Sequence, residues 1–192
     1  MGAEHSERRT ARMLFSITAA VAFAVALLLA VEAYKAEPAQ AHKLGHHSVR
    51  GGNIRYADGP DFDFVHARSW AVKQWNRLPR IPIVRDTSST DRDLEFRQYP
   101  GTSGPFQNDH AYYDYTPPDV DKIWFNTRIF RNHLGTYDKE AVAVHELGHA
   151  LNLDHPPRTR RWKNRSIMFW DAAATRFHSW QRHDKNDYNR YW

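Results

Sequence analysis

The chain has 192 residues, a formal charge of +5 and no cysteine. That length leaves room for one folded domain behind a processed N-terminus. The absence of cysteine excludes a disulfide framework, thiol-based catalysis and thiolate metal ligands. The charge excess is modest, so we predict no nucleic-acid partner and a solvated loop at its dense basic cluster, which comprises Arg158, Arg160, Arg161, Lys163 and Arg165.

The N-terminus carries a targeting pattern. Arg8, Arg9 and Arg12 precede an uncharged apolar run over residues 14–31, and small-residue sites follow at 31–33 and 39–41. This order is typical of a secretory signal peptide, and the run is close to the roughly 20 residues that span a bilayer. We therefore predict that residues 1–33 are a signal peptide or a signal anchor. The protein would be secreted, or anchored through residues 14–31 with the rest of the chain outside the cell.

Residues 34–50 are polar and show no apolar period, so they are predicted to be a linker or a short pro-segment. The pair His46 and His47 within them is interpreted as solvated. Residues 51–192 then form the single folded domain.

Five short runs in this domain predict strands, at residues 53–57, 81–84, 93–96, 110–113 and 122–126. Between the first two, apolar residues at a three-to-four spacing predict an amphipathic helix over 63–78, with Trp70 and Trp75 in the core. Residues 86–91 and 101–108 are predicted to be a turn and a loop.

The clearest helix pattern covers residues 136–151. Thr136 or Asp138 is the expected N-cap, and one side of the helix is apolar, formed by Ala141, Val144, Leu147, Gly148 and Leu151. A last helix is expected over 179–191, with Trp180 in the core. Strands combined with these helices predict an α+β domain with a mixed sheet.

Within the central helix, the sequence H-E-L-G-H-A-L-N-L-D-H begins at His145. A four-residue step on a helix turns roughly 400° and rises roughly 6 Å, so His145 and His149 project from one face and can reach one metal ion. His155 can join them only if the helix ends and the chain turns back. Asn152 lies where that turn is needed, and asparagine tolerates positive φ better than most residues.

Three imidazoles fit a catalytic zinc site that keeps its fourth position for water and lowers the pKa of that water to about 7. Glu146 is placed to act as the general base and proton shuttle. Another class of zinc site uses a later glutamate as third ligand, but no glutamate follows Glu146. His155 is therefore the predicted third ligand.

The pattern H-E-x-x-H-x-x-N-x-x-H resembles the zinc signature of the metzincins, in which glycine usually takes the place of Asn152. Ser166-Ile167-Met168, which ends 13 residues after His155, resembles their methionine turn. The resemblance implies a twisted mixed sheet with two long helices, an active-site helix, and a small C-terminal subdomain ending in a helix. It also implies that Met168 forms a hydrophobic floor under the imidazoles.

Other segments are similar to the matrixin branch, namely 71–75, 93–96 and 110–113 with 123–126. The chain departs from that branch at Pro156-Pro157 and at 169–171, and it lacks the cysteine latch. Subfamily, cleavage preference and the control of latency therefore stay open. By resemblance, residues 170–175 would line the substrate pocket, with Trp170 in its wall, and a substrate would lie along the strand near Tyr112.

These observations predict a monomeric zinc-dependent endopeptidase that acts on polypeptides with one catalytic Zn²⁺. The alternative is a non-catalytic zinc-containing module that binds cell wall or polysaccharide through some of its 7 tryptophans and 9 tyrosines. Two further groups could hold Ca²⁺ or a second zinc but lack complete ligand spacing, so no additional ion is assigned to them. They are Asp58, Asp61 and Asp63, and Asp109, His110 and Asp114.

Overall fold

The computed structural model describes residues 42–87, 91–104 and 106–192. The predicted targeting segment at 1–33 and the first part of the predicted linker lie outside these residues. Within the described part of the chain, no helix is long and apolar enough to cross a bilayer.

The sheet has five strands in the order β2-β1-β3-β5-β4. The first three pairings in this order are parallel, whereas β4 is antiparallel to β5 at one edge. The predicted mixed sheet is thus confirmed, with strand ends moved by one to three residues. The strands are β1 (Ile54–Asp58), β2 (Ile83–Arg85), β3 (Leu94–Tyr99), β4 (Ala111–Asp114) and β5 (Asp121–Asn126).

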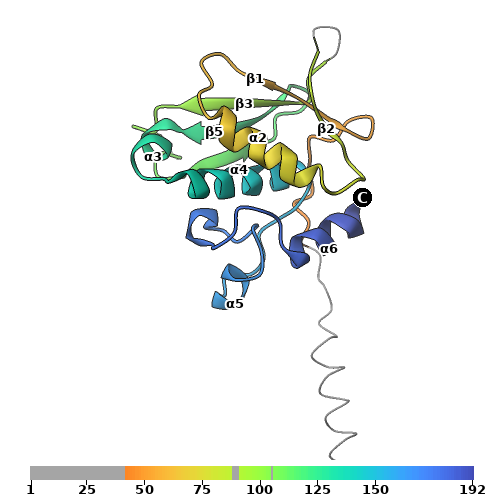
Figure 1. The fold of residues 1–192 in the computed structure, drawn as a ribbon. Helices are drawn as coiled ribbons and strands as arrows, with labels where there is room; N and C mark the ends of the chain where they lie inside the picture. Colours follow the sequence, from red (N-terminus) through yellow and green to blue (C-terminus); the bar gives the residue numbers. More distant parts are fainter. Residues whose placement is uncertain (1–41, 88–90, 105) are drawn as a thin grey trace, which may run out of the picture. The chain divides into compact units, whose positions relative to one another are not determined.

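Two helices, α2 (Val65–Trp75) and α4 (Thr136–Ala150), pack against each other beside the sheet (Figure 1). They bury the strand positions that alternate toward them, such as Ile54, Phe96 and Ile123. Trp75 is fully buried, and its indole Nε1 donates to the Val144 carbonyl at 2.8 Å. This bond fixes α4, the helix that carries H-E-x-x-H, against α2. As predicted, the core includes Trp75. Trp70 and Trp180, which were also expected in the core, are only partly buried and pack against it.

The beginning of α4 differs from the prediction. The N-cap is Gly135, not Thr136 or Asp138. Asp138 still contributes to capping, because its Oδ2 accepts a hydrogen bond from the Gly135 amide at 3.2 Å. A carboxylate in the first turn is also favoured by the positive end of the helix dipole.

A short helix, α3 (Thr127–Asn132), follows β5 directly and has no counterpart in the predicted elements. Asn126 ends the strand and caps this helix, since its Oδ1 accepts from the Ile129 amide at 3.2 Å. Its Nδ2 donates to the carbonyls of Gln107 and Asp109 at 3.1 and 3.0 Å. One buried amide therefore holds the loop that leads into β4.

After α4 the chain forms three short elements: α5 (Arg160–Lys163), the 3-10 helix η1 (Ala172–Ala174) and α6 (Arg182–Tyr191). The basic cluster lies largely in and around α5, a helical turn where a loop was predicted, and none of the α5 residues is buried. The last helix begins at Arg182 rather than at 179. Its first turn is capped by Asp184, which accepts from the Gln181 amide at 2.6 Å.

Residues 42–50, part of the predicted linker, pack on the domain. Lys43 forms a bridge with Leu153, and the Ser48 amide donates to the Ala150 carbonyl at 2.9 Å. The buried Ser48 hydroxyl donates to Asp121 at 2.8 Å. This terminal segment therefore connects the start of β5 with the end of α4.

Candidate metal centre and cleft

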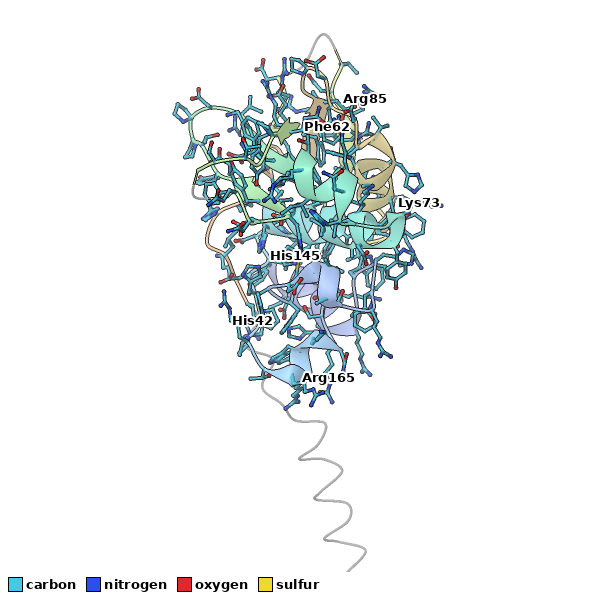
Figure 2. The ribbon with its side chains drawn as sticks, turned by 90° about the vertical axis from the view of Figure 1, so that its left-hand side faces the viewer. His42, Phe62, Lys73, Arg85, His145 and Arg165 are labelled. Atoms are coloured by element: carbon cyan, nitrogen blue, oxygen red, sulfur yellow. The ribbon has the colours of Figure 1, made fainter. Side chains whose placement is uncertain are left out.

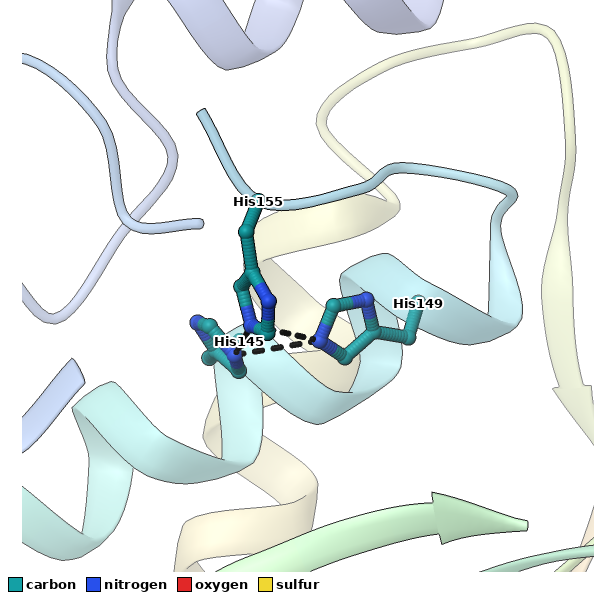
Figure 3. Close-up of side chains that lie close together, drawn as sticks. All are labelled: His145, His149 and His155. Atoms are coloured by element: carbon teal, nitrogen blue, oxygen red, sulfur yellow. Dashed lines mark hydrogen bonds between the residues drawn. The ribbon is translucent and has the colours of Figure 1, made fainter. Parts of the chain in front are cut away.

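The structure brings together the three predicted histidines. Nε2 of His145 lies 3.0 Å from Nε2 of His155 and 3.1 Å from that of His149, and the remaining pair is 3.2 Å apart. Figure 3 shows the three rings converging from the last turns of α4 and from the loop after it. Ligand atoms on a tetrahedron with bonds of 2.0–2.1 Å are separated by about 3.3 Å. The three nitrogens thus occupy three corners of a tetrahedron of zinc size.

Backbone carbonyls fix how two of these rings are protonated. Nδ1 of His145 donates to the Ile167 carbonyl, and Nδ1 of His149 donates to the Leu153 carbonyl, each at 2.8 Å. Their Nε2 atoms therefore carry lone pairs that face each other with no proton between them. A cation relieves that repulsion, and imidazoles held by a second hydrogen bond are the usual ligands of zinc. The donor set thus fits a metal ion.

The turn that returns His155 to the helix depends on Asn152. Its φ of 73° is left-handed, as predicted for this position. The Leu153 amide then donates back to the Gly148 carbonyl at 3.0 Å, and the Asn152 side chain accepts from the Gly45 amide at 2.9 Å. The asparagine therefore closes the helix and also holds the terminal segment, which glycine could not do through a side chain.

A buried carboxylate in α6 holds the carbonyl that orients His145. Asp184 accepts from the Ser166 hydroxyl at 2.5 Å and from the Ile167 amide at 3.0 Å. Burial raises the pKa of Asp184 to about 6, against the effect of these hydrogen bonds. Asp184 is thus a positioning residue that sequence reasoning missed, because a lone aspartate in a polar helix carries no distinguishing pattern.

Met168 packs against α4 at Gly148, which lies between His145 and His149 in the sequence. It is 2% exposed, and a Cβ built on Gly148 would stand 2.4 Å from its sulfur atom. The glycine of H-E-L-G-H therefore makes room for the methionine. Trp75 approaches the same point at 3.1 Å, so Gly148, Met168 and Trp75 pack densely together at α4.

Burial keeps the histidine cluster neutral. It lowers the pKa of His145 well below its ordinary value and that of His149 to about 4, and the neighbouring imidazoles add to both shifts. The pKa of His155 is also lowered, first by burial. Since metal ligands must be unprotonated, these shifts favour binding of a cation at neutral pH.

Glu146 lies in the same cleft and is 6% exposed. Burial raises its pKa to about 8, and the negative charge of Asp109 adds to this rise. The Tyr113 amide, which donates to the carboxylate, opposes it. A bound cation would lower the value, because opposite charge favours the ionised form. Such a carboxyl can change protonation near neutral pH.

The cleft that contains these residues has a volume of about 660 Å³. One wall is β4, the edge strand, which among the described residues pairs with β5 alone. Trp170 also lines the cleft, and the centroid of its exposed ring lies 4.8 Å from the Arg158 guanidinium. Asp171 and Ala172 also line the cleft, in the segment where the pocket was predicted.

The terminal segment supplies a part of the cleft that the sequence did not indicate. Leu44 and His46 line it, and the His46 ring stacks on Tyr115 with centroids 4.6 Å apart. The interpretation of His46 as solvated is therefore wrong. No local pattern reveals such packing, since it depends on contacts with residues far along the chain.

Among the described residues, two groups have the spacing of metal ligands. One is the catalytic-type triad, and the other consists of His42, His183 and Asp187. Neither of the acidic groups considered from the sequence is among them. Asp58 instead forms two hydrogen bonds with the buried Arg68, at 3.0 and 2.7 Å.

Comparison with protein-family models gives no match, and comparison with curated proteins gives none either. Among solved structures, the chain is similar to high choriolytic enzyme 1, a hatching enzyme zinc-protease from Oryzias latipes (medaka fish). The TM-score is 0.35 and the sequence identity is 18%. The match covers 54% of this chain and 44% of that one.

Proposed function

We propose that this chain is a zinc-dependent endopeptidase of the metzincin type. The observation that carries the proposal is the convergence of three imidazole nitrogens within 3.2 Å of one another in a cleft that also contains Glu146. His145, His149 and His155 would hold the ion. A purely structural metal site needs neither an open cleft nor a carboxyl beside it.

The chemistry divides between the ion and the chain. A zinc ion held by His145, His149 and His155 would supply an activated water molecule at neutral pH and a Lewis acid for a carbonyl group. Glu146 accepts a proton from the attacking water and delivers it to the amine that leaves. Its ability to hold and release a proton near neutral pH suits both steps. The carbonyls of Ile167 and Leu153 keep two of the ligand rings in the required orientation.

The proposed substrate is a polypeptide in extended conformation. The outer edge of β4 pairs with no other strand among the described residues and offers backbone groups to a further strand, which is a common way to bind peptides. Tyr112 and Tyr113 of this strand line the cleft, and so does Trp170. A peptide laid between them passes the histidines and Glu146. This arrangement favours cleavage within a chain over removal of terminal residues.

The finer assignment also belongs to this proposal. Met168, buried against Gly148 of α4, would be the methionine of the metzincin turn, and the elements from α5 to α6 would form the small C-terminal subdomain. The matrixin branch is proposed on the order of the strands and helices alone. Export and a monomeric state complete the proposal and rest on the N-terminal sequence pattern and on the single domain.

The proposal is tested by Glu146→Gln in the zinc-loaded protein. A peptide library is incubated with wild type and variant, and products are identified by mass spectrometry. General base catalysis contributes about 10² to 10⁴ in rate, so the variant should lose at least about 100-fold. Glu95→Gln, the same change at a buried residue of β3, is the matched control and should retain activity.

Zinc content is measured in every sample, so that loss of a base is separated from loss of the ion. A zinc-loaded Glu146→Gln that cleaves as fast as wild type would refute the mechanism, as would full activity after chelation. If no peptide is cleaved by either form, the alternative of a non-catalytic zinc-containing module is favoured instead.

A further inference from the structure

We propose that the chain has a second zinc site, formed by His42 of the terminal segment and by His183 and Asp187 of α6. Nδ1 of His42 lies 3.2 Å from Nε2 of His183 and 3.3 Å from Oδ2 of Asp187, and the last two atoms are 3.2 Å apart. Figure 2 places His42 away from His145, beside the C-terminal elements. The site is therefore separate from the catalytic cleft.

The spacing of these three atoms matches that of the first triad within 0.3 Å. It also matches the separation of about 3.3 Å expected for ligands of tetrahedral zinc. Two imidazoles and a carboxylate are ordinary ligands of this ion, whereas Ca²⁺ and Mg²⁺ prefer sites made of oxygen alone. The donor set thus selects zinc.

Hydrogen bonds alone satisfy this triangle only by crowding donors on one oxygen. A proton on only one of the facing nitrogens, His42 Nδ1 or His183 Nε2, leaves the lone pair of the other opposed to Asp187 Oδ2. Protons on both nitrogens would direct two N–H groups at Asp187 Oδ2, which also accepts from the His42 amide at 3.3 Å. A cation at the centre satisfies all three atoms at once.

The carboxylate has a further unmet requirement. Asp187 is 4% exposed, and its Oδ1 is buried without a hydrogen-bond partner among the described residues. Leaving a buried charged oxygen unpaired is expensive. The positive charge of a bound cation would offset this penalty. The cation could contact Oδ1 directly, or it could attract the negative charge that both carboxylate oxygens share.

The surroundings resemble a built site and not a surface cluster. The exposed fractions of the His42, His183 and Asp187 side chains are 17%, 14% and 6%. Trp162 of α5 covers the imidazoles, with its ring 4.4 Å from that of His183 and 5.8 Å from that of His42. An apolar cover of this kind limits access of water to the ligands.

A metal ion here would join the terminal segment to the last helix. It would also steady the catalytic loop, because the His42 carbonyl accepts from the Asp154 amide at 2.8 Å. Asp154 in turn accepts from the His155 amide at 2.6 Å. Two hydrogen bonds, both through Asp154, thus connect His42 of the second site with His155 of the catalytic site.

The test is the zinc content of the folded chain after loading with ZnCl₂ and exhaustive dialysis. Wild type should retain two equivalents, and His183→Ala should retain one. His149→Ala, which damages only the catalytic triad, should also retain one, and the double variant none. His133→Ala, at an exposed histidine after α3, is the matched control and should retain two.

Folding is monitored by circular dichroism, and His42→Ala is the second variant because it alters only the terminal segment. In the His149→Ala background, zinc should raise the melting temperature, and this rise should disappear when His42→Ala is added. One equivalent in wild type, or two in either His42→Ala or His183→Ala, would overturn the second site. Because zinc content is measured without substrate, this result stands apart from failure of the proposed peptidase activity.

Discussion

At the scale of single residues, Glu146 is buried, and its carboxyl group loses its proton only at an unusually high pH. Its pKa is raised from 4.5 to about 8 in the folded chain without metal. When burial raises the pKa of a carboxyl group in the folded chain, the free energy of unfolding begins to fall at the pH where this group ionises in the unfolded chain. The fall is complete once the pH exceeds the pKa in the folded chain. The penalty therefore grows as the pH rises from about 4.5 to about 8.

Glu146→Gln should remove this dependence. In metal-free protein, the free energy of unfolding of the variant minus that of wild type should increase by about 4 kcal/mol between pH 4.5 and pH 8. Urea unfolding followed by circular dichroism across this range measures the difference. The histidines are the same in both proteins, so their titration cancels. A difference that stays constant with pH would show that Glu146 is not perturbed by burial.

The candidate site shows what sequence can predict at this scale. His145 and His149 followed from helix geometry, and His155 from the need for a turn at Asn152. Asp184 and His42 could not be found in this way. Each acts through contacts with residues more than 15 positions away, and neither belongs to a local repeat.

At the scale of secondary structure, the packing of α4 depends on Gly148, because the absence of a side chain there leaves room for Met168. Gly148→Ala should destabilise the protein by up to about 2 kcal/mol, since overpacking costs about 1–3 kcal/mol and improved helix propensity returns about 1 kcal/mol. Urea unfolding of the single and double variants measures this. Adding Met168→Ala should make the alanine at 148 less harmful, with a coupling of at least about 0.5 kcal/mol.

Gly135→Ala is the control on the same helix. A Cβ there comes no closer than 3.5 Å to another side chain, so its effect should be smaller. Strictly additive effects of the changes at 148 and 168 would mean that the two residues do not share the space.

Element prediction succeeded where periodicity was strong. The apolar stripes of α2 and α4 and the alternation in the strands are set by burial on one side, which the sequence records directly. The short helix α3 was missed because it depends on one cap, Asn126, and offers only six residues of pattern. The packing of residues 42–50 was missed because their partners, such as Asp121 and Leu153, lie far along the chain.

At the scale of the whole molecule, bound zinc should contribute a large share of stability, because the domain has no disulfide. A ligand present at 1,000 times its dissociation constant stabilises the folded state by about 4 kcal/mol. For a domain of this size that corresponds to about 10 °C in melting temperature. Scanning calorimetry before and after chelation should therefore show a fall of about 10 °C for each zinc site that is emptied, reversed by ZnCl₂ and not by MgCl₂. An unchanged melting temperature would contradict a folding role for the ion.

The pairing of the terminal segment with the end of α4 has a consequence for biosynthesis. Leu44 and Ser48 leave the ribosome early, but their partners Asn152 and Ala150 are made more than 100 residues later. Contacts of such sequence separation close large loops and slow folding. A nascent chain thus has no complete cleft until its last third is synthesised. An activity of the proposed kind would therefore not arise before most of the chain has been made.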